Sequence, residues 1–179
     1  MKKRFACVCF AVLLCLCQCG CSVKGENHFS YRGKDFCAEV RGEMRGIGFS
    51  AVIACSVEAS GFDVGVRYLA PATLSRLEVT AFCDADGVPK SVGQLSWEGV
   101  ESEVDADEIT GLLLPICAFL RRSEISEVGY DGDCRRLTLS DGSILTLGGD
   151  GAPRSLQSEE IEVEIVWLEW SSELDLLKK

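Results

Sequence analysis

The stretch FSAVIACSVEASGFDVGVRY, residues 49–68, decides the fold of this chain. Phe49, Ala51, Ile53, Cys55 and Val57 form one apolar face opposite Ser50, Ser56 and Glu58, and the alternation resumes over residues 62–68. A period of two is typical of a strand that buries one face. Ser60 and Gly61 lie between the two runs, and both residue types favour a reversal of the chain. The stretch therefore predicts two antiparallel strands with a common buried face.

The same alternation continues on both sides of this stretch. It begins near Phe36 and returns over residues 77–83. It occurs again on either side of Asp141-Gly142, a dipeptide that favours a two-residue hairpin. Further turn chemistry separates the runs at Arg45-Gly46-Ile47-Gly48, Asp84-Ala85-Asp86-Gly87 and Gly148-Gly149-Asp150-Gly151.

The last alternating run, residues 161–167, changes phase near its end, because Leu168 and Trp170 are apolar while Glu169 is not. A bulge near Val166 produces such a slip. Before the slip, the run predicts four inward-facing side chains: Ile161, Val163, Ile165 and Trp167.

The segment that starts at Asp105 has a helical period instead. Asp105 and Glu108 fit a capping box. Pro115 removes a backbone donor, so we expect the helix to kink or restart there. Arg121 and Arg122 suit the C-terminal end of a helix. One apolar stripe follows the cap, formed by Ile109, Leu112, Leu113, Ile116 and Leu120.

The order of elements is then four or five strands, a helix, and four or five further strands. A helix with one apolar stripe has to bury it, and the inner face of a curved sheet is the available surface. We therefore predict an α+β fold. A strongly curved antiparallel β-sheet, a half-open barrel of about 8–10 strands, wraps over one or two central helices.

The N-terminus has the order of an export signal. Met1-Lys2-Lys3-Arg4 is cationic, residues 5–17 are apolar but too few to span a bilayer, and a small residue precedes Cys21. This order resembles a lipoprotein signal, in which the cysteine after the cut receives diacylglycerol. We predict a signal peptide over residues 1–20, lipidation of Cys21, a tether over residues 21–35, and a location on the outer face of the cell membrane. An ordinary secretory signal and an uncleaved anchor are the alternatives.

Composition limits the partners. The 179 residues suit one domain. After residue 20 the chain holds 15 basic and 28 acidic residues, a net charge of −13. Such a surface repels phosphate backbones and anionic headgroups. We therefore expect no nucleic-acid partner, and membrane contact only through the lipid anchor.

Cysteines are frequent, with eleven in the chain, but six of them lie in the signal or at the anchor. The spacing of the other five is wide and lacks a C-x-x-C pair for a redox or zinc site. Most of these positions fall on apolar faces, where a free thiol packs as a small hydrophobe. One or two disulfides are the alternative, and metal binding is a third. The five are Cys37, Cys55, Cys83, Cys117 and Cys134.

Three segments carry a family resemblance: Phe36-Cys37-Ala38-Glu39-Val40-Arg41-Gly42, Phe49-Ser50-Ala51-Val52 and Val66-Arg67-Tyr68-Leu69-Ala70-Pro71-Ala72-Thr73-Leu74. With the central helix and the closing hairpins, they resemble the LolA-like outer-membrane lipoprotein-sorting family. The resemblance implies a single domain over residues 36–179, with a hydrophobic cavity for acyl chains between sheet and helix. The long N-terminal helix of the soluble carriers is missing, and this chain carries its own anchor. A tethered binder therefore fits better than a diffusing carrier.

Catalytic chemistry is not indicated. His28 is the only histidine and lies in the tether, where it is a poor base for a Ser-His-Asp or Cys-His arrangement. The motifs Gly-x-Ser-x-Gly and Gly-x-x-x-x-Gly-Lys are absent from the sequence. The carboxylate runs over residues 101–108 and 159–164 indicate solvated acidic faces. We predict no enzyme, no cofactor and no metal site; calcium is an alternative to tight turns at Asp84 with Asp86 and at Asp131 with Asp133.

The remaining candidate site is the cavity itself, since ligand sites are usually concave and mostly apolar. Binding of a lipid or another hydrophobic molecule is the first hypothesis. The alternative is a non-catalytic envelope module with a solid core, whose acidic surface binds a protein partner; an enzyme or enzyme accessory is a third. An empty volume under the sheet distinguishes the first two. The residues expected to line it are Phe49, Phe62, Tyr68, Leu77, Ile109, Leu112, Leu113, Ile116, Phe119 and Trp167.

Overall fold

The computed structural model describes residues 28–171. The predicted signal peptide over residues 1–20, the lipidation of Cys21 and the first part of the predicted tether lie outside the described residues, as do residues 172–179. Among the described residues, no helix is both long and apolar enough to cross a membrane.

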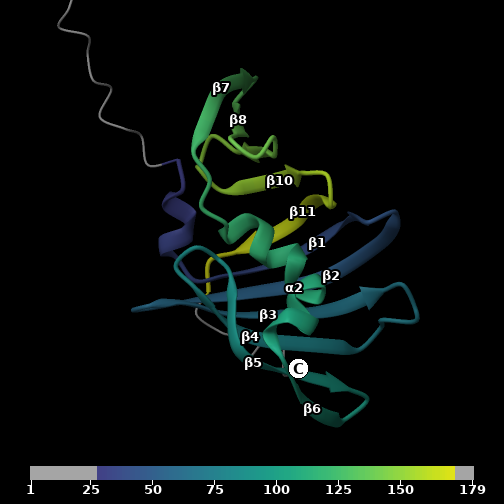
Figure 1. Cartoon of the computed structure of the whole chain (residues 1–179). Helices are drawn as coiled ribbons and strands as arrows, with labels where there is room; N and C mark the ends of the chain where they lie inside the picture. Colours follow the sequence, from purple (N-terminus) through teal and green to yellow (C-terminus); the bar gives the residue numbers. More distant parts are fainter. Residues whose placement is uncertain (1–27, 172–179) are drawn as a thin grey trace, which may run out of the picture.

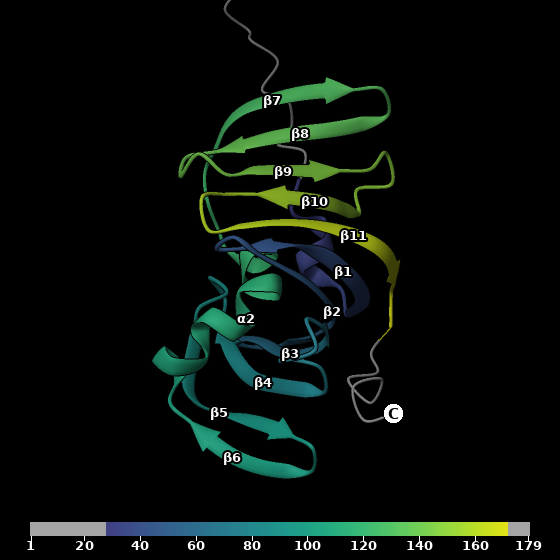
Figure 2. The ribbon, with the colours of Figure 1, turned by 90° about the vertical axis from the view of Figure 1, so that its right-hand side faces the viewer.

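The domain is built on one antiparallel sheet of eleven strands in the order β6-β5-β4-β3-β2-β1-β11-β10-β9-β8-β7 (Figures 1 and 2). Strands that follow one another in the chain are paired, except β6 and β7, which the helix separates. The first strand, β1, also pairs with the last strand, β11. The strands are β1 (Phe36–Met44), β2 (Ile47–Glu58), β3 (Gly61–Ala70), β4 (Leu77–Asp84), β5 (Pro89–Trp97), β6 (Val100–Val104), β7 (Ile125–Asp131), β8 (Cys134–Leu139), β9 (Ile144–Leu147), β10 (Pro153–Gln157) and β11 (Ile161–Glu169).

The helix α2 (Ala106–Leu120) lies across the inner face of the twisted sheet, mainly against β3, β4 and β5 (Figure 1). The alternating residues of the strands and the apolar side of α2 form one hydrophobic core. Two tyrosines tie α2 to its surroundings. The hydroxyl of Tyr68 on β3 donates to the carbonyl oxygen of Leu112 over 2.8 Å, and that of Tyr31 donates to the carbonyl oxygen of Phe119 over 2.6 Å.

The predicted α+β class, with an antiparallel sheet over a helix, agrees with this architecture, but the expected number of 8–10 strands was too low. Six strands precede α2 and five follow it. The sheet stays open, with β6 and β7 at its edges. The strand β6 has no buried side chain, so its sequence VESEV shows none of the alternation that predicts a half-buried strand.

The helix begins where the sequence predicts but differs in two details. Asp105 is the residue before its first turn, yet its side chain makes no capping hydrogen bond. The backbone carbonyl of Asp105 accepts the first bond instead, from the amide of Glu108 over 3.0 Å. The helix also continues through Pro115 without restarting. A single proline removes one backbone bond, and burial of the apolar side of α2 outweighs that loss.

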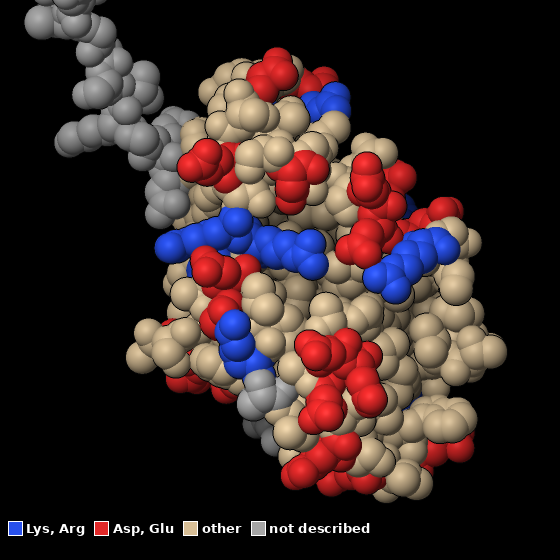
Figure 3. All heavy atoms as spheres, viewed as in Figure 1, with Lys and Arg blue, Asp and Glu red and all other residues tan. Residues whose placement is uncertain are grey.

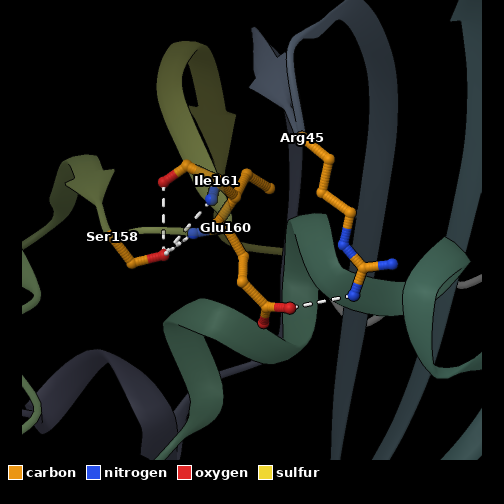
Figure 4. A network of polar contacts seen from close by, with 4 residues as sticks. All are labelled: Arg45, Ser158, Glu160 and Ile161. Atoms are coloured by element: carbon orange, nitrogen blue, oxygen red, sulfur yellow. Dashed lines mark hydrogen bonds and ion pairs between the residues drawn. The ribbon is translucent and has the colours of Figure 1, made fainter.

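The pair of β1 with β11, which we call the seam, joins the two halves of the sheet. Three polar pairs cross it: Arg41 with Glu164, Arg45 with Glu160, and Glu39 with Trp167. Figure 4 shows one of them, in which the guanidinium of Arg45 after β1 reaches the carboxylate of Glu160 before β11 over 2.8 Å. The hydroxyl of Ser158 accepts hydrogen bonds from the amides of Glu160 and Ile161 and so orders the same turn.

The domain begins earlier than we predicted. Ser30–Gly33, assigned to the tether, forms a 3-10 helix (η1) against the core. Tyr31 is 1% exposed, and burial raises the pKa of its hydroxyl. An isolated tyrosine in a polar stretch has no periodic neighbours, so the sequence pattern did not indicate its burial.

Replacing Tyr31 with phenylalanine is expected to lower the free energy of unfolding by about 1–3 kcal/mol, because the Phe119 carbonyl then stays buried without its donor. Urea denaturation followed by circular dichroism measures the change. Tyr130→Phe is the matched control, since the Tyr130 side chain is exposed, and its effect should stay within about 0.5 kcal/mol. Equal effects of the two changes would contradict a structural role for Tyr31.

Candidate functional site

Among the described residues, most of the apolar side chains between sheet and helix are buried in one core cluster. Of the ten residues that we predicted to line a cavity, eight are buried in the core and a ninth, Leu112, is half-buried against it. Four of the eight are fully buried: Tyr68, Ile109, Leu113 and Ile116. The other four are at most 8% exposed: Phe49, Phe62, Leu77 and Phe119.

A small hollow lies beside α2, where Leu114 and Ala118 face Leu139 and Leu156. Its volume is about 20 Å³, enough for about one water molecule. Pockets for small organic ligands measure roughly 300–1,000 Å³. This hollow therefore cannot hold an acyl chain, and the residues predicted for a cavity form a packed core instead.

Trp167 is the tenth predicted residue, and its inward orientation was wrong. In the seam, Glu39 pairs with Trp167 and Val40 pairs with Ile165, which leaves Val166 as the extra residue. The bulge predicted near Val166 is thus confirmed. Because the slip falls before Trp167 and not after it, the indole turns away from the core and is 39% exposed. Its Nε1 donates to the carboxylate of Glu39 over 2.9 Å.

A hollow of about 650 Å³ lies at the seam, on the side of the sheet away from α2. Its walls carry charge: Arg41 and Glu164 form an ion pair of 3.1 Å across it, and Glu43 and Glu162 lie beside them. An acyl chain would bind poorly here, because it would remove these charged groups from water without offering them hydrogen bonds. A second hollow of about 410 Å³, beside η1, is lined in part by Phe62 and by two arginines.

One of these arginines, Arg32, is a buried cation that the sequence pattern did not indicate. Its guanidinium donates to the carbonyl oxygen of Ala85 over 2.7 Å and lies 5.5 Å from the centre of the Phe62 ring. Burial lowers the pKa of Arg32, and the neighbouring Arg122 lowers it further. The contacts of Arg32 hold η1 against the turn between β4 and β5, which is a structural role.

The free edge strand β6 is strongly acidic. Residues 98–108, which we call the acidic edge, run from the turn before β6 into the first turn of α2 and contain six carboxylates and no basic residue. All six side chains are exposed, and among the described residues none of them forms an ion pair. Figure 3 shows acidic side chains gathered over β6 and the start of α2. The six are Glu98, Glu101, Glu103, Asp105, Asp107 and Glu108.

Within residues 28–171, the outer backbone edge of β6 has no strand partner. One side of the strand pairs with β5 from Gly93 to Trp97, and the other side is the edge of the sheet. The strand contains no proline and no register shift, two of the devices that keep an edge from pairing. The opposite edge strand, β7, has such a shift at Ser126, whose hydroxyl bonds to the carbonyl of Thr138.

Three other carboxylates that the sequence singles out lie in ordinary strand or turn positions. Glu162 and Glu164 are exposed on the outer side of β11, as predicted. Asp84 accepts from the amides of Asp86 and Val88, and the Val88 amide and the Lys90 ammonium hold its pKa below the usual range. Within residues 28–171, no group of three or more His, Cys, Asp or Glu side chains is arranged to hold a metal ion.

No protein-family model matches this sequence, and no curated protein matches it. Solved structures do match the fold. MucB, also solved in complex with MucA(peri), is 19% identical with a TM-score of 0.52; the match covers 86% of this chain and 60% of MucB, less than two thirds of its length. A conserved protein from Thermus thermophilus is 12% identical with a TM-score of 0.50, over 82% of this chain and 85% of that one.

A LolA superfamily protein from Nitrosomonas europaea is also similar, at 8% identity and a TM-score of 0.37, over 82% of this chain and 90% of that one. The similar solved structures include a member of the superfamily that the sequence resembles. At these identities the likeness concerns the fold alone: an open antiparallel sheet over a helix, the architecture shared with MucB.

Proposed function

We propose that this chain is a lipid-anchored, non-catalytic module on the outer face of the cell membrane, which binds a protein partner along the acidic edge. The observation that carries the proposal is the combination, on one strand, of an unpaired backbone edge and unpaired carboxylates. A basic segment in an extended conformation fits both features. Its backbone adds a strand to β6, and its Lys or Arg side chains meet Glu101 and Glu103.

Charge also makes the edge selective. Two copies of β6 placed edge to edge would bring their carboxylates together, and like charges directly opposite each other destabilise a strand pair. An acidic edge therefore disfavours self-association while it favours a basic partner. The net negative charge of the domain attracts the same class of partner over longer distances.

The filled interior favours this proposal over binding of a lipid between sheet and helix. A lipid would have to displace fully buried side chains such as Leu113 and Ile116, or lift α2 off the sheet against the hydrogen bonds from Tyr68 and Tyr31. The anchor rests on the N-terminal sequence, where a small residue and Cys21 follow a cationic, apolar signal.

The test measures binding of a fluorescent peptide of about eight residues, alternating Lys with Thr, to the full-length protein by anisotropy. Glu101→Lys combined with Glu103→Lys is expected to weaken binding at least about tenfold at low salt, because two attractive contacts become repulsive. Raising the salt from about 50 to about 200 mM should weaken binding to the unmodified protein.

The matched control makes the same charge change at the other edge, with Glu124→Lys and Glu127→Lys at β7, and should leave binding nearly unchanged. A peptide methylated on alternate backbone nitrogens should bind poorly, because it cannot pair with β6. If both variants lost peptide binding equally, the binding would depend only on the overall negative charge of the protein, and the proposal would be overturned. Saturable one-to-one uptake of a fluorescent fatty acid by the unmodified protein would instead favour the lipid hypothesis.

A further inference from the structure

Three buried thiols face the core: Cys55 on β2, Cys83 on β4 and Cys117 on α2. Their positions follow from the sequence, since each occupies an apolar position of its strand or helix. Cys83 and Cys117 are in direct contact, with their sulfur atoms 3.7 Å apart. Cys37 lies in a separate small cluster, and Cys134 lies on β8 and is half-buried.

We propose that Cys83 and Cys117 are a disulfide site that links β4 to α2 when the chain folds in an oxidising compartment. In this reaction the two thiols lose two protons and two electrons, and one sulfur–sulfur bond forms. The oxidant is a second disulfide, such as oxidised glutathione or a protein disulfide, which takes up the two electrons and is reduced to two thiols.

The sulfur atoms have to approach each other from 3.7 Å to about 2 Å. A disulfide places its sulfurs about 2 Å apart, and a change in the χ1 angle of either cysteine moves its sulfur by a comparable distance. Between the two residues the chain passes through β5 and β6 before it enters α2. The bond would close a loop of 34 positions.

The bond has to form before the core closes. A thiolate attacks the oxidant, and both cysteines are at most 2% exposed in the folded domain. The contact between the two lowers the pKa of Cys83 and raises that of Cys117, but burial keeps a dissolved oxidant from reaching either sulfur once the helix is in place. Oxidation therefore accompanies folding, which suits a chain that folds after export.

The disulfide would keep α2 attached to the sheet. The Tyr68 hydroxyl already holds α2 at Leu112, and the Tyr31 hydroxyl holds it at Phe119. The disulfide would add a covalent link at Cys117, between these two points. A domain locked in this way keeps its interior closed to ligands, in line with the proposed function, although the disulfide does not depend on it.

The experiment refolds the full-length protein with oxidised or with reduced glutathione, blocks free thiols with iodoacetamide, and maps tryptic peptides by mass spectrometry without reduction. Cys83 lies in the peptide 77–90, Cys117 in 91–121 and Cys55 in 46–67, so each possible bond gives its own linked mass. The expected product is the 77–90 peptide joined to 91–121. The oxidised protein should melt about 10 °C higher than the reduced one.

Cys55→Ala is the control, because it removes the third buried thiol and should leave the linked peptide and the melting difference intact. Cys83→Ala and Cys117→Ala should each abolish both. Protein folded under reduction and then given oxidised glutathione should form the bond at least about tenfold more slowly. Two alkylated peptides after oxidative refolding, a bond to Cys55, or a chain that folds only under reduction would each overturn the proposal.

Discussion

A Leu113→Ala variant is expected to lose about 3–5 kcal/mol of its free energy of unfolding. Leu113 is fully buried on α2, between the helix and the sheet. Removing its side chain from a packed interior gives up both the transfer free energy of the lost methyl groups and the contacts around the new cavity. Urea denaturation followed by circular dichroism gives the difference, provided that the slope of the transition is unchanged.

This prediction distinguishes a solid core from a ligand cavity. Leu112→Ala, one position earlier on the helix, is the matched control, because its side chain is only half-buried; we expect it to lose about 1 kcal/mol. The cavity made by Leu113→Ala should also take up benzene and regain stability, as dry apolar cavities do. A loss below about 1 kcal/mol at Leu113 would mean that the space around it was already empty, and would restore the lipid hypothesis.

Gly42→Ala is expected to destabilise the domain by about 3 kcal/mol, through the seam. Gly42 lies on β1 opposite Val163 on β11, and a Cβ atom added to it would collide with the backbone oxygen of Glu162. Neither backbone can yield by side-chain rotation, so β1 has to move away from β11. Misfits of this kind in packed regions typically cost about 1–3 kcal/mol or more.

Gly48→Ala serves as the control, because it lies on β2, close to Gly42, with no atom nearer to its added Cβ than the Gly42 oxygen at 3.9 Å. It should change stability by less than about 1 kcal/mol. Thermal melting of both variants, followed by circular dichroism, measures the contrast. A harmless Gly42→Ala would mean that the two strands are not held as closely as the structure indicates.

Much of the fold could be predicted from local patterns. The turns at Ser60-Gly61 and Asp141-Gly142, the start of the helix and the bulge near Val166 depend on a few adjacent residues, and all of them agree with the structure. The strand β6 was missed because its side chains are all exposed or nearly so, which leaves no apolar alternation to detect.

The state of the candidate site could not be predicted in the same way. The residues that line a cavity and those that fill a core have the same apolar pattern. The difference between them depends on how closely α2 approaches the sheet, a distance set by contacts far apart in the chain, such as that of Tyr31 with Phe119. Whether Trp167 faces the core or the solvent likewise depends on whether the bulge comes before or after this residue in the strand.

The seam also determines when the domain can assemble. Its strands come from the two ends of the described chain; Glu39 and Trp167, which bond across it, are 128 positions apart. If the chain enters a compartment with its N-terminus first, one edge of β1 therefore has no strand partner until β11 has also entered. During that interval strands β1–β6 and strands β7–β10 are two separate sheets, each exposing an edge that is internal in the finished domain. Folding completes late, with the arrival of the final strand, and any chain that ends before β11 stays divided at its centre.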